Sequence, residues 1–109
     1  MKLFNADTIV EVIHSRVRLS ILAFLSTVGS TDFVSLRSQV NISDGSLSQN
    51  LKKLEEVGYV LLDRKVVDGK TKTTVTLTKS GNEALLDYVA NLKSMLDAIP
   101  NTIGDHLVR

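Results

Sequence analysis

The 109-residue sequence has no cysteine, no apolar run long enough to cross a membrane, and almost no net charge. The absence of cysteine excludes disulfides and thiolate metal sites, fits a reducing cytoplasm, and predicts no thiol-based redox response. The sequence does not show the series of a charged region, an apolar region and small residues that marks a signal peptide. We therefore expect a cytoplasmic protein without a membrane partner. The net charge of +1 is too small to indicate a nucleic-acid partner by itself.

The sequence also lacks the patterns on which common enzymes depend. It contains no glycine-rich phosphate loop and no Ser/His/Asp or Cys/His arrangement. Its one notable pair of carboxylates, Glu55 and Glu56, is expected on a helix surface. The two histidines, His14 and His106, are far apart and have no spaced acidic cluster, so we expect no metal site. We therefore predict that the protein is not an enzyme and uses no cofactor.

The composition is that of an ordinary globular protein, with 43% apolar and 23% charged residues. At this length we expect a single domain over residues 1–109, with its core within about residues 9–78. The stretch from Arg37 to Lys79 holds eight basic residues and five acidic ones, a local excess of three positive charges. This local excess favours an anionic partner.

A predicted helix over residues 43–57 is the most informative segment. Ser43 is a good N-cap, and Leu47, Leu51 and Leu54 recur at the spacing of one helical face, which should pack on a core. The remaining surface of this helix is polar, which suits contact with base edges and phosphates. The polar residues are Ser46, Ser48, Gln49, Asn50, Lys52 and Lys53.

The preceding residues complete a helix-turn-helix pattern. A short helix is expected up to Ile13, followed by a strongly apolar helix from Ser15 to Val28. Asp32 caps a third helix, and Asn41-Ile42 forms a tight turn into the polar-faced helix. Two helices joined by such a turn are the arrangement whose second member lies in the DNA major groove.

After Gly58 the apolar period changes from that of a helix to that of a strand. Two alternating segments, Tyr59–Val67 and Lys70–Leu77, flank Asp68-Gly69, which is a strong signal for a two-residue hairpin. We interpret residues 64–73 as a wing whose basic side chains contact the DNA backbone, keep the exposed edge from pairing with other chains, or both. These side chains are Arg64, Lys65, Lys70 and Lys72.

A long helix over residues 79–99, before Pro100, carries a second apolar pattern. Its spacings alternate between three and four residues, which is typical of helices that pair with one another. The residues of this seam are Leu85, Tyr88, Leu92, Met95 and Ile99. We expect a homodimer in which this helix, with Ile9 and Ile13 from the N-terminal helix, meets its symmetry mate. The alternative is a helix that packs entirely on its own core.

In their order, these features resemble the small winged-helix transcriptional regulators of the MarR/ArsR-like superfamily. The resemblance covers roughly residues 9–90 and rests on an ordered set of short matches, among them Ile13-His14-Ser15, Val17-Arg18-Leu19, Ser43-Asp44-Gly45, Leu51 through Glu56, Gly58-Tyr59-Val60 and Gly81. It implies a mainly α fold with a small antiparallel β-hairpin (α+β), a winged helix-turn-helix with a long C-terminal dimerisation helix. It also implies that a dimer binds duplex DNA, with a recognition helix in each major groove and the wing on the flanking backbone.

The expected function is therefore sequence-specific regulation of transcription by a DNA-binding homodimer. The alternative is a winged-helix protein–protein interaction module of a transcription or other complex. Relatives of this kind often respond to a small molecule, but the short chain offers no evident effector pocket, so this point stays open. The residues to which we assign DNA contact are Arg37, Ser43, Gly45, Ser46, Ser48, Gln49, Asn50, Lys52, Lys53, Arg64, Lys65, Lys70 and Lys72.

Overall fold

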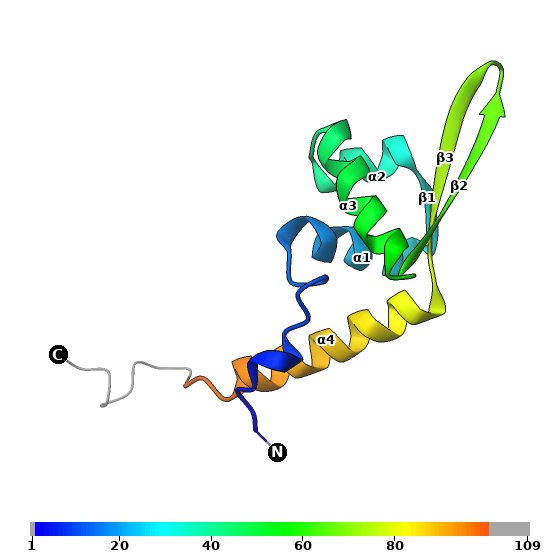
Figure 1. Ribbon diagram of the computed structural model, residues 1–109. Helices are drawn as coiled ribbons and strands as arrows, with labels where there is room; N and C mark the ends of the chain where they lie inside the picture. Colours follow the sequence, from blue (N-terminus) through cyan, green and yellow to red (C-terminus); the bar gives the residue numbers. More distant parts are fainter. Residues whose placement is uncertain (1, 101–109) are drawn as a thin grey trace.

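The computed structural model describes residues 2–100, and over this range it has four α-helices and one three-stranded antiparallel sheet. In chain order the elements are the 3-10 helix η1 (Ala6–Thr8), α1 (Arg16–Val28), β1 (Ser30–Asp32), α2 (Phe33–Val40), α3 (Asp44–Glu56), β2 (Val60–Val67), β3 (Lys70–Leu77) and α4 (Lys79–Asp97). The helices α1 to α3 form one cluster, the β2–β3 hairpin projects beyond it, and α4 runs away on the other side (Figure 1). This arrangement confirms the predicted α+β winged helix-turn-helix fold.

Each α-helix begins at a polar side chain that accepts a hydrogen bond from a backbone N–H three residues further on. The four N-caps are Ser15, Asp32, Ser43 and Thr78, of which Asp32 and Ser43 are predicted as caps above. Such a cap satisfies one of the orphan amides of the first turn, so these residues decide where each helix starts. At its other end, α4 stops at Asp97, two residues before the predicted end at Ile99.

The titration of Asp32, the N-cap of α2, can be related to stability. Its carboxylate accepts hydrogen bonds from the backbone N–H of Ser35 and from the Ser35 hydroxyl, both at 2.8 Å. These bonds, the backbone one first, lower the pKa of Asp32 from its ordinary value of 3.8. The folded state favours the charged form of Asp32, so the charged cap contributes its full stabilisation of the fold at pH values above the ordinary pKa. This contribution is lost as the pH falls through the lowered pKa of the folded state.

We therefore expect the stability of the wild type relative to Asp32→Asn to fall on acidification. An asparagine caps about as well as an aspartate but does not titrate, so the variant isolates the contribution of the charge. Urea unfolding at neutral pH and at about pH 3 measures the difference. If the wild type and Asp32→Asn differ in unfolding free energy by the same amount at both pH values, the charge of Asp32 does not contribute as described.

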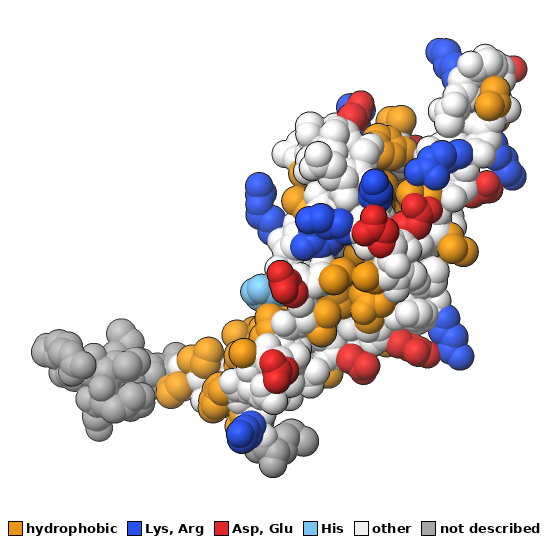
Figure 2. Space-filling view, in the orientation of Figure 1, with side chains coloured by type: hydrophobic (Ala, Val, Ile, Leu, Met, Phe, Trp, Pro, Cys, Tyr) orange, Lys and Arg blue, Asp and Glu red, His pale blue; other side chains and the backbone are white. Residues whose placement is uncertain are grey.

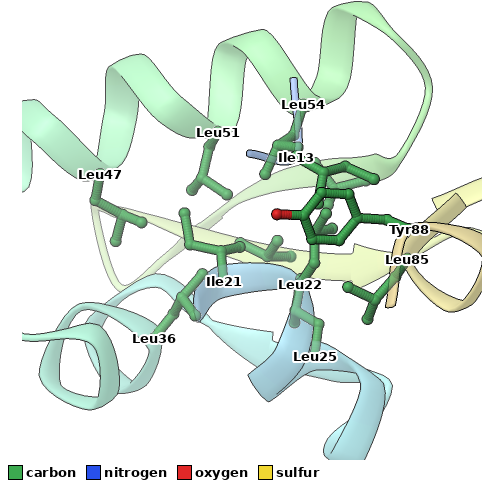
Figure 3. Close-up of a cluster of buried hydrophobic side chains, with 12 residues drawn as sticks. Ile13, Ile21, Leu22, Leu25, Leu36, Leu47, Leu51, Leu54, Leu85 and Tyr88 are labelled. Carbon is green, nitrogen blue, oxygen red and sulfur yellow. The ribbon is translucent and has the colours of Figure 1, made fainter. Parts of the chain in front are cut away.

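The core joins α3 to the rest of the helical cluster. Leu47, Leu51 and Leu54 point from α3 toward Ile21 and Leu22 of α1, and all five side chains are buried (Figure 3). Full burial of one such side chain stabilises the fold by roughly 1.5–3 kcal/mol. The apolar stripe of α3 therefore fixes which side of this helix meets solvent. The remaining buried residues of the cluster are Ile13, Leu25, Leu36, Val60, Val75, Leu85 and Tyr88.

The hairpin forms in the predicted register. Strands β2 and β3 pair from Val60 opposite Leu77 to Val67 opposite Lys70. Between them Asp68 and Gly69 have φ angles of 53° and 76°. Positive φ at both positions is what a type I′ turn requires, and aspartate followed by glycine adopts it at low cost. The backbone at Asp68-Gly69 thus confirms the two-residue hairpin turn that the sequence predicts.

Two parts of the N-terminal half differ from the sequence-based predictions. The residues after Gly29, predicted only as a break, form the short strand β1, in which Ser30 lies opposite Thr76 of β3. Before α1, the predicted helix up to Ile13 is replaced by η1 and a turn. The chain is extended at Ile9 because it must pass from the side of α4 into the core, where Ile13 is fully buried. No helix within residues 2–100 combines the length and the apolarity needed to span a membrane.

Candidate nucleic-acid interface

Helix α3 turns a continuous polar face to solvent. Its three leucines face the core, so the residues on the opposite side of the helix are exposed. The exposed residues among those assigned to DNA contact are Gly45, Ser48, Gln49, Lys52 and Lys53. They lie along one side of the helix, and none of them is buried.

The first turn of α3 is held by polar contacts at its start. The Ser43 hydroxyl accepts a hydrogen bond from the Ser46 backbone N–H at 3.1 Å, so this serine acts first as a cap. Arg37 of α2 forms an ion pair with Asp44, with 3.3 Å between Nη1 and Oδ1, and the two side chains are 43% and 70% exposed. Exposed pairs of this kind contribute about 0–1 kcal/mol, so an incoming phosphate can compete for Arg37.

Asn50, assigned to DNA contact from the sequence, makes its hydrogen bonds within the protein in this structure. Asn50 is half-buried on the side of α3 that faces α1. Its Oδ1 accepts a hydrogen bond from Nη1 of Arg18 at 2.8 Å, and its Nδ2 donates to the Ser46 carbonyl oxygen at 2.8 Å. Both polar ends of the amide are therefore occupied within the protein. No local pattern in the sequence indicates this bond, because Arg18 and Asn50 are distant along the chain.

The wing carries its basic residues on both faces of the hairpin. Lys65 lies directly opposite Lys72, and Lys70 lies opposite Val67, so three lysines share the outer face. Because successive side chains of a strand point to opposite faces, Arg64 lies on the other face of the hairpin, which is the side of α3. Figure 2 shows Lys and Arg side chains from the helical cluster to the end of the wing, with acidic side chains between some of them.

A groove separates the wing from the helices α2 and α3. It consists of two adjoining hollows of about 580 and 370 Å³, which share Phe33, Ser48 and Thr73 as lining residues. Lys52 of α3 and Arg64 of β2 line the smaller hollow, and Lys72 of β3 lines the larger. The polar face of α3 and the side of the wing that carries Arg64 are thus two walls of one groove, whereas Lys65 and Lys70 lie on the outer face of the wing and line neither hollow.

Helix α4 is only partly available for pairing with a second copy. Three predicted interface residues are buried in the core of the same chain: Ile13 is fully buried, Tyr88 is 1% exposed and Leu85 is 4% exposed. The first turns of α4 pack on α1, which uses this part of the seam. Leu92 and Met95 are half-buried, and Ile9 packs against the core. The exposed apolar residues of this region are Leu3, Phe4, Leu86, Val89, Leu96 and Ile99.

Of the two histidines, His14 lies within the described residues 2–100. Among residues 2–100 no three His, Cys, Asp or Glu side chains are grouped so that they could hold a metal ion. Nδ1 of His14 instead lies 2.5 Å from the hydroxyl oxygen of Tyr88, at hydrogen-bonding distance. His106 lies outside the described residues.

The comparison with known families agrees with this geometry. The family model of the winged helix DNA-binding domain matches residues 17–96, from α1 into α4. The chain belongs to this family. An uncharacterized protein of Methanocaldococcus jannaschii is 37% identical over 79 residues, which are 72% of this chain and 86% of that protein.

Solved structures have the same winged helix fold. A transcriptional regulator homologue from Pyrococcus horikoshii superposes with a TM-score of 0.80 and 24% identity, over 89% of this chain and 96% of its own. A MarR-family transcriptional regulator from Silicibacter pomeroyi gives a TM-score of 0.63 and 20% identity, over 94% of this chain and 68% of its own. The resemblance to MarR-like regulators is therefore confirmed at the level of the fold.

Proposed function

We propose that this winged helix protein binds duplex DNA sequence-specifically and regulates transcription by occupying an operator. The observation that carries the proposal is the groove between the polar face of α3 and the side of the wing that carries Arg64. The major groove admits an α-helix, and a hairpin beside that helix can reach the flanking backbone. On this proposal the protein acts by occupancy alone, as one domain over residues 1–109.

The contacts divide by position on the surface. Gln49, at the middle of the exposed face of α3, is placed to meet base edges, with Ser46 and Ser48 beside it. Gly45 lets the first turn come close to a phosphate, and Ser43 caps that turn. The backbone contacts are assigned to Arg37, Lys52, Lys53, Arg64, Lys65, Lys70 and Lys72.

The charge arrangement in the wing supports an anionic partner. Like charges directly opposite one another in a sheet are destabilising, yet the register places Lys65 against Lys72. Asp63 offsets this only in part, because its carboxylate is 3.7 Å from Lys65 Nζ and both groups are exposed. A DNA phosphate beside the two lysines would remove the repulsion.

We further propose that the protein acts as a homodimer through the outer side of α4. Leu86, Val89 and Leu96 lie along one side of this helix and are exposed, while Leu3 and Phe4 expose further apolar surface at the N-terminus. Figure 2 shows hydrophobic side chains at the surface in this region. Two-fold pairing would present two recognition helices to half-sites about one DNA turn apart.

Selection from random duplexes, followed by fluorescence-anisotropy titration, tests the proposed function. We expect a selected duplex to bind at least about 1,000-fold more tightly than bulk DNA at physiological salt. Equal affinity for all duplexes, or no binding, would instead favour the protein–protein interaction module. Winged helices also serve in that way, and the exposed face of α3 would then be a protein contact.

Single substitutions should distinguish residues that contact the DNA backbone from residues that contact base edges. Lys72→Ala is expected to weaken binding similarly on all duplexes and to lower the salt slope by about 0.9 for each lost phosphate contact. Gln49→Ala should cost roughly 1–3 kcal/mol, mainly on the selected duplex.

Lys79→Ala is the matched control for the lysine variant, because it removes the same charge from an exposed site at the start of α4. Anisotropy titrations of all three variants at several salt concentrations give both quantities. If Gln49→Ala weakens selected and random duplexes equally, base contact is assigned to the wrong residue.

A further inference from the structure

Arg18 joins three separate parts of the chain. It lies in the first turn of α1 and is half-buried. Its Nε donates a hydrogen bond to the Val12 carbonyl oxygen at 2.6 Å, and its Nη1 donates to Oδ1 of Asn50 at 2.8 Å. The planar guanidinium holds its N–H groups in a fixed fork, so these two bonds set the position of α3 relative to the segment before α1.

Asn50 is suited to this joint and is removed from base recognition by it. Recognition of adenine by asparagine uses the amide oxygen and nitrogen together. Here the oxygen accepts from Arg18, while the nitrogen donates to the carbonyl of Ser46 at 2.8 Å and lies 3.4 Å from the Ser46 hydroxyl. Arginine has only donors, so Asn50 must turn its oxygen toward Arg18.

The same segment is attached to α4. Two residues after Val12, Nδ1 of His14 lies 2.5 Å from the hydroxyl oxygen of Tyr88, whose ring is part of the core. Within residues 2–100, Arg18 makes no ion pair with an acidic side chain. Its hydrogen bonds therefore hold neighbouring segments in position. The residues from Val12 to Arg18 connect α3, the proposed recognition helix, to α4, the helix that we assign to dimerisation.

We propose that Arg18 is a positioning residue for DNA recognition, which acts through Asn50 to set the orientation of α3 relative to α4. The inference rests on the proposed function, because the orientation matters only if two copies of α3 must meet two half-sites. With Arg18 in place, the separation of the recognition helices is narrowly defined. Without it, α3 keeps its leucine contacts but can shift on them.

The expected result concerns half-site spacing. Titrations use the selected duplex and two relatives in which the half-sites are moved one base pair closer or further apart. Arg18→Ala should lose roughly tenfold on the selected duplex, a coupling of ordinary size for one hydrogen-bond network, and should discriminate less against the altered spacings. Arg16→Ala is the matched control, because Arg16 is exposed in the same turn and loses the same charge. It should keep the spacing preference.

Two variants of Asn50 separate positioning from base contact. Asn50→Ala should cost about as much as Arg18→Ala, and the double variant should cost no more than either alone. Asn50→Asp should bind all duplexes more weakly through charge repulsion and yet retain the spacing preference, because a carboxylate still accepts from Arg18. This variant also guards against loss of folding in the alanine variants.

The outcomes distinguish this inference from the proposed function. Additive losses in the double variant, or loss of the spacing preference in Asn50→Asp, would overturn the positioning role. In that case the wild type still binds a selected duplex, and the proposed function stands. If the wild type selects no duplex, the function and the positioning role both fail.

Discussion

Replacing Leu86 and Leu96 by glutamate should convert the protein from a dimer to a monomer and remove most of its operator affinity. Both side chains lie on the outer side of α4, 58% and 54% exposed, so the change places charge on the proposed interface without opening the core. Binding through two linked half-sites exceeds binding through one by about 100- to 10,000-fold. We therefore expect an affinity loss of at least about 100-fold.

The matched control is Asn91→Glu with Ser94→Glu. These exposed polar residues lie on the opposite side of the same helix, so the control adds the same charge away from the proposed interface. Light scattering at micromolar concentration measures the mass of each variant. A monomeric wild type, or a Leu86/Leu96 variant that remains dimeric, would exclude this face of α4 as the interface.

Gly81→Ala should cause a large loss of stability although it adds only one methyl group. A Cβ at this position would lie 2.2 Å from the carbonyl oxygen of Tyr59, a backbone atom that cannot turn away. The surroundings are held by hydrogen bonds from Thr78, whose N–H donates to that oxygen and whose hydroxyl donates to the carbonyl oxygen of Gly58. The first turn of α4 must therefore move for an alanine to fit.

Two opposing effects decide the sign of this change. Alanine gains about 1 kcal/mol of helix propensity over glycine, whereas overpacking against fixed backbone costs up to about 3 kcal/mol or more. We expect a net loss of roughly 2 kcal/mol or more by urea unfolding. Gly45→Ala is the control, because it adds the same methyl group in the first turn of α3 with no atom within 4 Å. It should be neutral or stabilising, and a neutral Gly81→Ala would contradict the account.

The features that the sequence predicts well are encoded by neighbouring residues. A cap such as Ser43 acts three residues ahead, the leucines of α3 repeat within two turns, and the Asp68-Gly69 turn is complete in itself. Helix α3 and the wing follow from such local signals. So does most of the exposed polar face, because the face opposite a buried stripe is exposed.

The features that the sequence predicts poorly depend on residues far apart along the chain. Strand β1 has only three residues, too few to show an alternating pattern. Asn50 carries the same amide whether it meets a base or Arg18, and only the packing of α1 on α3 decides between them. The apolar residues of the seam on α4 likewise recur at one regular spacing, although they lie in two different environments. Leu85 and Tyr88 are covered by the same chain, whereas Ile99 is exposed.

The most direct test of the DNA-binding surface is an NMR titration of isotope-labelled protein with the selected duplex. The amide signals that shift identify which part of the fold meets DNA. We predict the largest changes in the first two turns of α3, from Ser43 to Gln49, and in the wing from Arg64 to Thr73, with small changes along the outer side of α4. Shifts confined to α4 and the N-terminal segment, with α3 and the wing unchanged, would contradict the central claim.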